Sequence, residues 1–424
     1  MKKFKKDSLY LKLNKIAFNA HQSLRAIASL SSEEKNKILM CMADALIQQK
    51  DLVLEANKKD IEYVVKKGLS RAFIERLTLD KRRIIEMAES LRQIAALPDP
   101  VGTTITSWKR PNGLSIAKVR VPIGVILIIY ESRPNVTSDC IGLCFKSGNA
   151  VILKGGSDAL NSNKSIYGIL QQVIKDHKSL PEAVSFISMP ERKAVDILLS
   201  LDQYIDLVMP RGGESLIEEI KNKSRIPVIK HYKGICHVYV DDSADLEIAK
   251  KIVYNAKVQR PSVCNAVETL LVHTAIAEKF LPEMLGLLQK AGVELRGCAR
   301  TKKIVPEVKK ASLKDWETEY LDLILSVKVV DNVVEAIDHI NHYGSHHSDA
   351  IIAEDAAHKE MFLKEVDSAC VYANASTRFT DGYQFGFGAE IGISTDRLHA
   401  RGPMGLEDLT TYKYVVEGQG QIRE

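Results

Sequence analysis

A single cysteine stands in a polar setting at residues 258–269, VQRPSVCNAVET, where Cys264 follows an Arg-Pro pair and precedes an asparagine. Free cysteines are among the most buried residue types and are usually inert, so core packing is the ordinary interpretation of such a residue. Arg260 lies four residues upstream, however, and a nearby cation favours the nucleophilic thiolate over the thiol. We therefore treat Cys264 as a candidate nucleophile.

Two Gly-Gly pairs, in LKGGSDAL and MPRGGESL, mark candidate phosphate-binding turns. Each follows a predicted strand and opens a helix, where free N–H groups and the helix dipole favour an anion. Each pair alone is equally well explained as a simple turn, but two at the ends of parallel strands favour a ligand crevice. Neither matches GxGxxG. Lys154 either faces a nucleotide ribose or its 2′-phosphate, or points to solvent. The cofactor-binding candidates are Lys154, Gly155, Gly156, Ser157, Arg211, Gly212 and Gly213.

The other cysteines give no sign of chemistry. The seven cysteines form an odd set without paired spacing, which argues against a disulfide framework and for a reducing compartment. Cys140 and Cys144 are four residues apart on an apolar helical stretch, so we expect them to pack in the core. No second ligand pair accompanies them, so we expect no zinc site here.

Four of the eleven histidines, His339, His342, His346 and His347, fall within HINHYGSHHSDAI. No neighbouring carboxylate or cysteine set completes a metal site, so we expect no metal. The favoured interpretation is a loop that contacts the substrate, and the alternative is a group of histidines on the surface without a functional role.

The composition limits the classes of protein to which the chain can belong. The chain has 424 residues, 45% of them hydrophobic, enough for two or three globular domains. Its start lacks the apolar core of a signal peptide, and its longest apolar run falls far short of the roughly 20 residues that span a bilayer. The net charge of +5 comes from 59 basic and 54 acidic residues mixed along the chain. We expect a cytoplasmic protein that binds neither membranes nor nucleic acid.

The expected elements change along the chain. Residues 8–97 have helical spacing and a Ser-x-x-Glu capping signature, and they predict one helical layer. Residues 103–122 predict a hairpin around Pro-Asn-Gly, and 409–424 has strand composition. From residue 123, unbroken apolar runs such as IGVILIIY alternate with helices, which predicts a parallel, doubly wound sheet. A second strand-helix series, from CHVYVDD to DSACVYAN, predicts a second α/β domain.

Several motifs carry a resemblance over essentially the whole chain. QRPSVCN, YESRPN, GNAVILKGGS and GSHHSD, together with GICHVYVD and HARGPMGLEDLTT, resemble the gamma-glutamyl phosphate reductases, the proline-biosynthetic branch of the aldehyde dehydrogenase superfamily. The resemblance implies an α/β, aldehyde-dehydrogenase-like fold with a Rossmann-like cofactor domain, an α/β catalytic domain and a small β oligomerisation element. The implied ranges are 1–102 and 123–233 for cofactor binding, 234–375 for catalysis, 103–122 and 409–424 for oligomerisation, and 376–408 for a segment that returns near the cofactor site.

The resemblance also implies a reaction. L-glutamate 5-phosphate is reduced by NADPH to L-glutamate 5-semialdehyde and phosphate through a thioester on the cysteine, as the second step of proline biosynthesis. The implied partners are this substrate, further copies of the chain in a homo-oligomer, and glutamate 5-kinase as a transient partner. Because residues 1–97 form one helical layer, we expect no kinase domain ahead of the reductase region.

Roles follow residue by residue from the same resemblance. Cys264 is the nucleophile, and its backbone N–H and the Asn135 side chain are the expected donors to the oxyanion. Arg133 and Arg260 are candidates to bind the phosphate or carboxylate of the substrate, because a guanidinium fork matches both groups. Either could instead pair with a local carboxylate. His347 is expected to line the substrate pocket.

Two other functions remain open. A hydrolytic semialdehyde dehydrogenase would share the scaffold but needs a glutamate to activate water, and the corresponding stretch, VIKHYKGICH, offers none. A catalytically silent binding subunit would need neither Cys264 nor the two Gly-Gly turns. Both features therefore favour the reductase.

Overall fold

The chain divides into two compact units. In the computed structural model of the protein, which describes residues 7–131, 133–177, 181–230 and 233–423, the first unit comprises 1–230, 386–392 and 404–424, and the second 231–385 and 393–403. The segment 376–408 thus contributes to both units, and its first ten residues belong to the unit that carries Cys264.

The predicted helical layer at the start of the chain is confirmed. It consists of α1 (Ser8–Ala28), α2 (Ser32–Gln48), α3 (Lys50–Lys66), α4 (Arg71–Leu77) and α5 (Lys81–Ala96). The Ser-x-x-Glu signature closes a capping box, in which the Glu34 amide donates to Ser31 and the Ser31 amide donates to the Glu34 carboxylate. These two bonds satisfy amides that a helix start would otherwise leave without partners.

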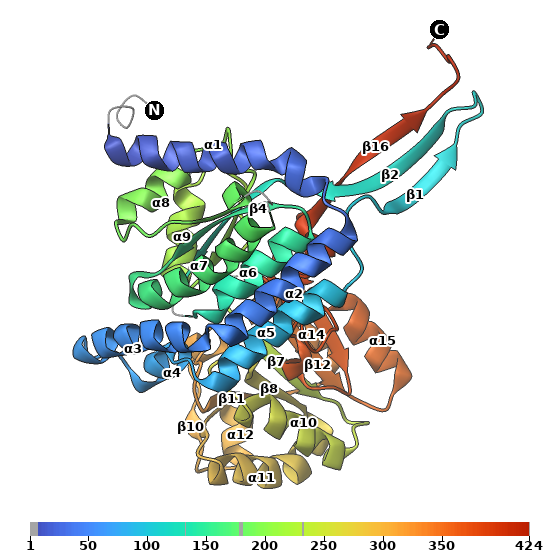
Figure 1. Cartoon of the computed structure of the whole chain (residues 1–424). Helices are drawn as coiled ribbons and strands as arrows, with labels where there is room; N and C mark the ends of the chain where they lie inside the picture. Colours follow the sequence, from blue (N-terminus) through green and yellow to red (C-terminus); the bar gives the residue numbers. More distant parts are fainter. Residues whose placement is uncertain (1–6, 132, 178–180, 231–232, 424) are drawn as a thin grey trace. The chain divides into compact units, whose positions relative to one another are not determined.

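A parallel sheet of four strands forms the centre of the first unit (Figure 1). Its order is β5-β4-β3-β6, with β3 (Val125–Tyr130), β4 (Ala150–Gly155), β5 (Val184–Phe186) and β6 (Leu207–Arg211). Residues of α1, α8 (Arg192–Leu198) and α9 (Glu214–Lys223) form one core with β3, β4 and β6. Helices α6 (Asn135–Lys146) and α7 (Leu160–Asp176) also pack on the sheet, with α2 and α5 against α6. The doubly wound sheet expected from the apolar runs is confirmed.

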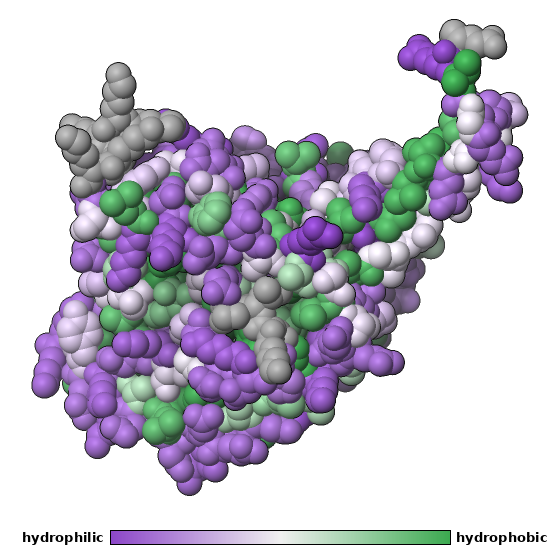
Figure 2. Space-filling view, turned by 45° about the horizontal axis from the view of Figure 1, so that its top comes forward, coloured by the Kyte–Doolittle hydropathy of each residue, from purple (hydrophilic) through white to green (hydrophobic). Residues whose placement is uncertain are grey.

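The predicted hairpin and the last strand form a separate antiparallel sheet of order β1-β2-β16. Its strands are β1 (Thr104–Lys109), β2 (Ser115–Pro122) and β16 (Thr410–Glu417). Trp108, Tyr412, Tyr414 and Val416 are each at least 40% exposed on it, and apolar surface is visible along these strands in Figure 2.

The second unit is built on a parallel sheet of seven strands in the order β10-β9-β11-β8-β7-β12-β13. The strands are β7 (Cys236–Val240), β8 (Val267–His273), β9 (Glu294–Gly297), β10 (Lys309–Lys310), β11 (Ile324–Val330), β12 (Ser348–Ile352) and β13 (Cys370–Ala373). The helices are α10 (Leu246–Val258), α11 (Thr274–Lys290), α12 (Ala299–Ile304), α13 (Leu313–Trp316), α14 (Val333–Tyr343) and α15 (Ala356–Glu365). Buried apolar side chains of β7, β8, β11, α10 and α11 form its largest core. The second α/β domain predicted from the sequence is therefore present.

Two short strands, β14 (Ile393–Ser394) and β15 (Gly402–Pro403), pair with each other, and the remaining helical turns are 3-10 turns at Ser157–Ala159, Pro181–Ala183, Thr377–Phe379 and Glu407–Leu409. Among the helices in the described ranges, none has both the length and the apolar composition of a membrane span.

Candidate active site

Cys264 lies in the loop that joins the end of α10 to the start of β8, and its side chain is half-buried. The loop is pressed against Gly234, where a β-carbon would overlap the Cys264 carbonyl group. That carbonyl accepts a hydrogen bond from the buried Cys236 thiol at 3.2 Å. The backbone of the candidate nucleophile is therefore held in one place by its neighbours, as a positioned nucleophile requires.

A buried ion pair joins the two ends of the Cys264 loop. Lys257, at the end of α10, places Nζ 2.8 Å from Oε2 of Glu268 and 3.0 Å from the Val267 carbonyl of β8. Both charged side chains have no exposed surface. Burial raises the pKa of Glu268 to about 7, against the lowering effect of Lys257, and burial lowers the pKa of Lys257. The sequence analysis did not single out either residue.

A glutamate, Glu319, also lies at the base of this loop. The stretch VIKHYKGICH alone did not indicate it. The Gly234 amide donates to Oε1 of Glu319 at 2.9 Å, and Oε1 of Glu268 accepts from the Leu321 amide at 3.2 Å. Both carboxylates are therefore hydrogen-bonded to backbone amides of the scaffold, and these bonds tie the cysteine loop to the segment before β11.

Arg378 is a further cation of the site that sequence reasoning missed. It sits in the 3-10 turn Thr377–Phe379, and its Nε donates to Oε1 of Gln259 at 2.9 Å. The turn is tied to Asn265, because Thr377 donates to the Asn265 carbonyl and the Asn265 amide group donates to the Thr380 carbonyl. Its only sequence signal is an arginine within NASTRF, far along the chain from the cysteine.

The structure corrects the expectation that His347 lines the substrate pocket. Its side chain has no exposed surface, so it does not present an edge to a small molecule. It lies behind the cysteine loop, with Nδ1 3.7 Å from the Cys236 thiol and 2.9 Å from the Ser348 hydroxyl. In this structure His347 contacts Cys236, whose thiol donates to the Cys264 carbonyl.

His339 of the same histidine-rich segment is also buried, in α14, so the interpretation of the whole segment as a surface or substrate loop is wrong for it. Burial, and after it the charges of His237 and Lys328, lowers the pKa of His339 to about 2. His339 is therefore a neutral core residue.

The first unit brings the cofactor candidates together at one edge of its sheet. Tyr130 at the end of β3 pairs with Gly155 of β4 on one side and with Arg211 of β6 on the other. The turns that follow β3 and β6 lead to opposite sides, so this edge is a topological switch point, where α/β sheets bind ligands. A β-carbon at Gly155 would overlap the Asn163 amide, and one at Gly212 would lie 2.6 Å from Glu131. Packing of the protein itself therefore requires glycine at 155 and 212, whereas a β-carbon at Gly213 would have nothing within 4 Å.

The expectation of free amides at the two helix starts needs correction. The Asn161 and Ser162 amides at the start of α7 donate to the buried Asp60 carboxylate at 3.2 and 2.7 Å. At the start of α9, the Gly213 amide donates to Glu131 at 3.2 Å. Carboxylates from elsewhere in the unit already satisfy these donors, so an anion at either turn has to use other groups.

The alternative that Lys154 points to solvent is wrong, and its contact with a nucleotide ribose or 2′-phosphate stays a prediction. Its side chain is 6% exposed and its Nζ donates to the Gly155 carbonyl at 3.0 Å. Burial lowers its pKa, against the opposing charge of Glu191. In this conformation the lysine supports the glycine turn and does not reach solvent.

The remaining sequence candidates occupy the turn between β3 and α6 and the cysteine loop. Asn135 is the exposed first residue of α6, and its side-chain amide donates to Asp139 at 3.1 Å. Arg133 is half-buried just before it, and Arg260 is exposed in the cysteine loop. Cys140 and Cys144 are fully buried in α6, which confirms their assignment to the core.

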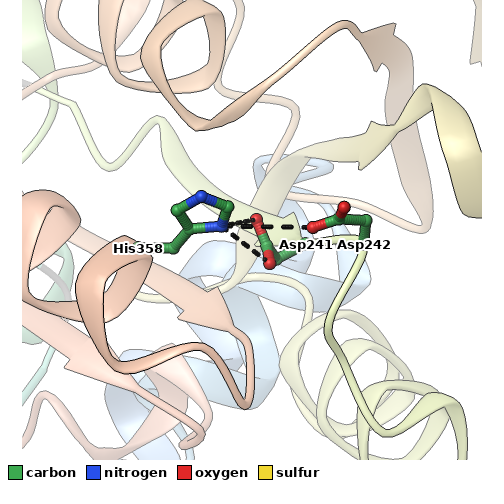
Figure 3. A group of neighbouring side chains, drawn as sticks. All are labelled: Asp241, Asp242 and His358. Atoms are coloured by element: carbon green, nitrogen blue, oxygen red, sulfur yellow. Dashed lines mark hydrogen bonds and ion pairs between the residues drawn. The ribbon is translucent and has the colours of Figure 1, made fainter.

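Asp241, Asp242 and His358 form another cluster of ligand-type side chains (Figure 3). The Asp241 carboxylate accepts from the Tyr239 hydroxyl, from Ser243 and from His358 Nδ1. These hydrogen bonds account for the grouping without an ion.

Comparison with known proteins places the chain in a family. The aldehyde dehydrogenase family model matches residues 11–318. The gamma-glutamyl phosphate reductase of Thermodesulfovibrio yellowstonii is 56% identical over 414 residues, covering 98% of this chain and 99% of its own. The chain belongs to the gamma-glutamyl phosphate reductase family. A second family member, from Thermoanaerobacter sp. (strain X514), is 58% identical over 409 residues, covering 96% of this chain and 99% of its own.

A solved family structure has the same fold. The crystal structure of gamma-glutamyl phosphate reductase from Thermotoga maritima superposes with a TM-score of 0.95 at 48% identity, covering 97% of this chain and all of that one. The expected aldehyde-dehydrogenase-like fold is thereby confirmed. Membership in this family of aldehyde dehydrogenases implies a nicotinamide cofactor, and the first unit offers a switch-point edge, where α/β sheets bind ligands.

Proposed function

We propose that the protein reduces L-glutamate 5-phosphate to L-glutamate 5-semialdehyde and phosphate with NADPH, the second step of proline biosynthesis from glutamate. The observation that carries the proposal is the near-complete match to gamma-glutamyl phosphate reductases. The ordered half-buried loop that holds Cys264 supports it, because the reaction needs a positioned sulfur nucleophile.

The chemistry follows from the thiolate. Cys264 adds to the acyl carbon of the substrate, phosphate leaves with the electrons of the C–O bond, and a thioester remains. A nicotinamide cofactor supplies the hydride when bound. The tetrahedral product collapses by breaking its C–S bond, which frees the aldehyde and restores the thiolate. The Cys264 backbone N–H and Asn135 are the proposed donors to the oxyanion.

Residues of the first unit are the proposed cofactor site. Gly155, Gly156, Ser157, Arg211, Gly212 and Gly213 lie at the switch-point edge of the parallel sheet, and the open space at Gly213 is the proposed place of the pyrophosphate. Lys154 acts from beneath the turn, through its hydrogen bond to Gly155.

The second half of the proposal concerns assembly. The exposed aromatic face of the β1-β2-β16 sheet is the proposed contact between copies of the chain in a homo-oligomer, because exposed apolar patches of this kind mark interaction sites. Glutamate 5-kinase is retained as a proposed transient partner, since it produces the labile substrate.

The function is tested in the reverse direction, by phosphate-dependent oxidation of glutamate semialdehyde with NADP. We expect Cys264→Ala to reduce the rate by about a thousandfold or more, as loss of a covalent nucleophile does. Cys370→Ala is the matched control, a thiol of the same unit that is remote in sequence from the cysteine loop. Near-normal turnover by Cys264→Ala would rule out the nucleophile. A carboxylate product formed without phosphate would identify the hydrolytic dehydrogenase instead.

A further inference from the structure

Two arginines stand beside Cys264 without carboxylate partners among the residues that the structure describes. Arg260 is exposed, and Arg378 is half-buried. Arg378 donates a hydrogen bond from Nε to Oε1 of the neutral Gln259 side chain, 2.9 Å away. Both Nη groups of Arg378 are therefore left for another acceptor, since no partner for them lies within the described ranges.

The two guanidinium groups also act on each other and on the cysteine. Burial, and after it the positive charge of Arg260, lowers the pKa of Arg378, while the nearby Cys264 opposes this change. Like charges in a partly buried setting repel, and an anion between them turns the repulsion into attraction. The charge pattern is thus the one expected of a site that an anion completes.

The carboxylate of Asp381 also opposes the lowering of the Arg378 pKa. Its Oδ1 accepts from the Tyr383 and Gln384 amides at 3.0 and 3.2 Å. These bonds hold Asp381 in its own turn, and no ion pair joins it to either arginine in the part of the chain that the structure describes.

Hydrogen bonds hold the Arg378 turn against the loop that carries Arg260 and Cys264. Gln259, the partner of Arg378, is the neighbour of Arg260, and Asn265, which follows Cys264, binds the backbone of the Arg378 turn. The cysteine loop and the turn Thr377–Phe379 are therefore one hydrogen-bonded structure that carries both arginines and Cys264.

We propose that Arg260 and Arg378 together hold the phosphate group of the acyl phosphate beside Cys264, and hold inorganic phosphate in the reverse reaction. This inference rests on the proposed function. Two guanidinium forks match the oxygens of a phosphate and stabilise the negative charge that it gains as the C–O bond breaks. In reverse, a phosphate oxygen held there attacks the thioester carbon, and the C–S bond breaks to release the thiolate.

The kinetic test uses the full-length protein and the variants Arg378→Gln and Arg260→Gln. We expect each to raise the KM for inorganic phosphate about ten- to a hundredfold, as loss of a charge-assisted hydrogen bond does, and to leave the KM for NADP within about twofold. Arg378→Lys keeps the charge but loses the fork, so it recovers only part of the loss. The matched control is Arg82→Gln, an arginine that is exposed on α5.

A second readout does not depend on turnover. Inorganic phosphate should slow the alkylation of Cys264 by iodoacetamide more than sodium chloride of equal ionic strength does. Peptide mass spectrometry measures the alkylated fraction. This protection should disappear in Arg378→Gln and in Arg260→Gln. Arg260 has an exposed side chain, so its variant keeps the test valid if Arg378→Gln does not fold.

The outcomes separate the two proposals. An unchanged KM for phosphate in both variants of an active enzyme overturns the arginine site. Absence of phosphate-dependent turnover in the unaltered protein overturns the proposed function, and the alkylation assay then decides the anion site alone. Protection that is equal for phosphate and chloride overturns the anion site.

Discussion

At the scale of single residues, the cysteine loop depends on charges that have no contact with water. The Lys257–Glu268 pair has no exposed surface, and each partner is also bonded to backbone, Lys257 to the Val267 carbonyl and Glu268 to the Leu321 amide. Buried pairs of this kind add little net stability, but loss of one partner leaves an uncompensated buried charge. The two ends of the loop are therefore held by a pair of charged side chains, and replacement of one of them alone should destabilise the protein.

We therefore expect Lys257→Met to lower the free energy of unfolding by about 3–5 kcal/mol and to lower kcat, because one end of the Cys264 loop is released. Urea denaturation measures the first effect and the reverse assay the second. Lys251→Met, at an exposed position of the same helix, should change the stability by less than about 0.5 kcal/mol.

The double variant Lys257→Met with Glu268→Leu tests whether the stability lost in Lys257→Met comes from the unpaired buried charge or from the changed shape of the side chain. It removes both charges and should recover most of the lost stability. A double variant that is less stable than Lys257→Met alone would contradict the role given to the buried charge.

At the scale of elements, a histidine joins two turns of the second sheet. Asp241 follows β7, and its carboxylate accepts from Ser243 and from His358 of α15, while the Glu354 and Asp355 amides donate to the Ser243 hydroxyl. The Ser243 bonds fasten the turn after β7 to the turn after β12. The bond between His358 and Asp241, drawn in Figure 3, joins α15 to the same turn. The hydrogen bond to Asp241 raises the pKa of His358 above its ordinary value of 6.5.

The pH dependence of this contact follows from the direction in which the pKa of His358 is shifted. A histidine whose pKa is raised in the folded state stabilises fully below its unfolded value and loses the effect as pH rises through the folded value. Burial alone raises the pKa of Asp241, but hydrogen bonds from Ser243 and His358 outweigh it and lower that pKa. The Asp241 contribution is therefore lost only in acid, as pH falls below its ordinary value of 3.8.

We expect His358→Gln to lower the melting temperature at pH 5.5, with a difference from the unaltered protein that shrinks toward pH 9. The effect is small, on the order of 1 kcal/mol or less, because the side chain is 35% exposed and solvent screens the pair. Thermal melting across this range measures it. His342→Gln, at an exposed histidine of α14, is the control, and a difference that does not vary with pH would contradict the assignment.

At the scale of the whole molecule, one sheet has a face that the chain itself does not cover. Trp108 packs edge-on against Tyr414, Tyr414 against Tyr412, and Lys118 lies over the Tyr412 ring. These residues come from all three strands of the β1-β2-β16 sheet. A sheet of three strands with an aromatic face is more stable when a second surface covers that face.

We expect the double variant Tyr414→Lys with Val416→Lys to shift the protein toward smaller assemblies, because two buried charges would have to be accommodated in the contact. Size-exclusion chromatography with light scattering measures the mass. Leu313→Lys places the same charge at another exposed apolar position, 75% exposed in α13, and should leave the mass unchanged. An unaltered mass in the double variant would remove this sheet from the assembly.

Local pattern was enough for the parts of the protein that depend on neighbours in sequence. The strands β3, β4 and β6 are unbroken apolar runs, the capping box of α2 lies within four residues, and Cys264 stands beside Arg260 in one loop. Short-range periodicity and local charge encode these features directly, because the interactions that form them act within a few residues.

Only the tertiary structure decided which groups meet across the chain. Asp60 satisfies the start of α7, His347 is buried behind Cys236, and Arg378 reaches the cysteine loop from a distant turn. Burial and long-range hydrogen bonds depend on how sheets and helices pack, and residue type alone does not specify this packing. The sequence by itself therefore determined the fold class and offered Cys264 as the candidate nucleophile, and packing decided which groups surround that cysteine.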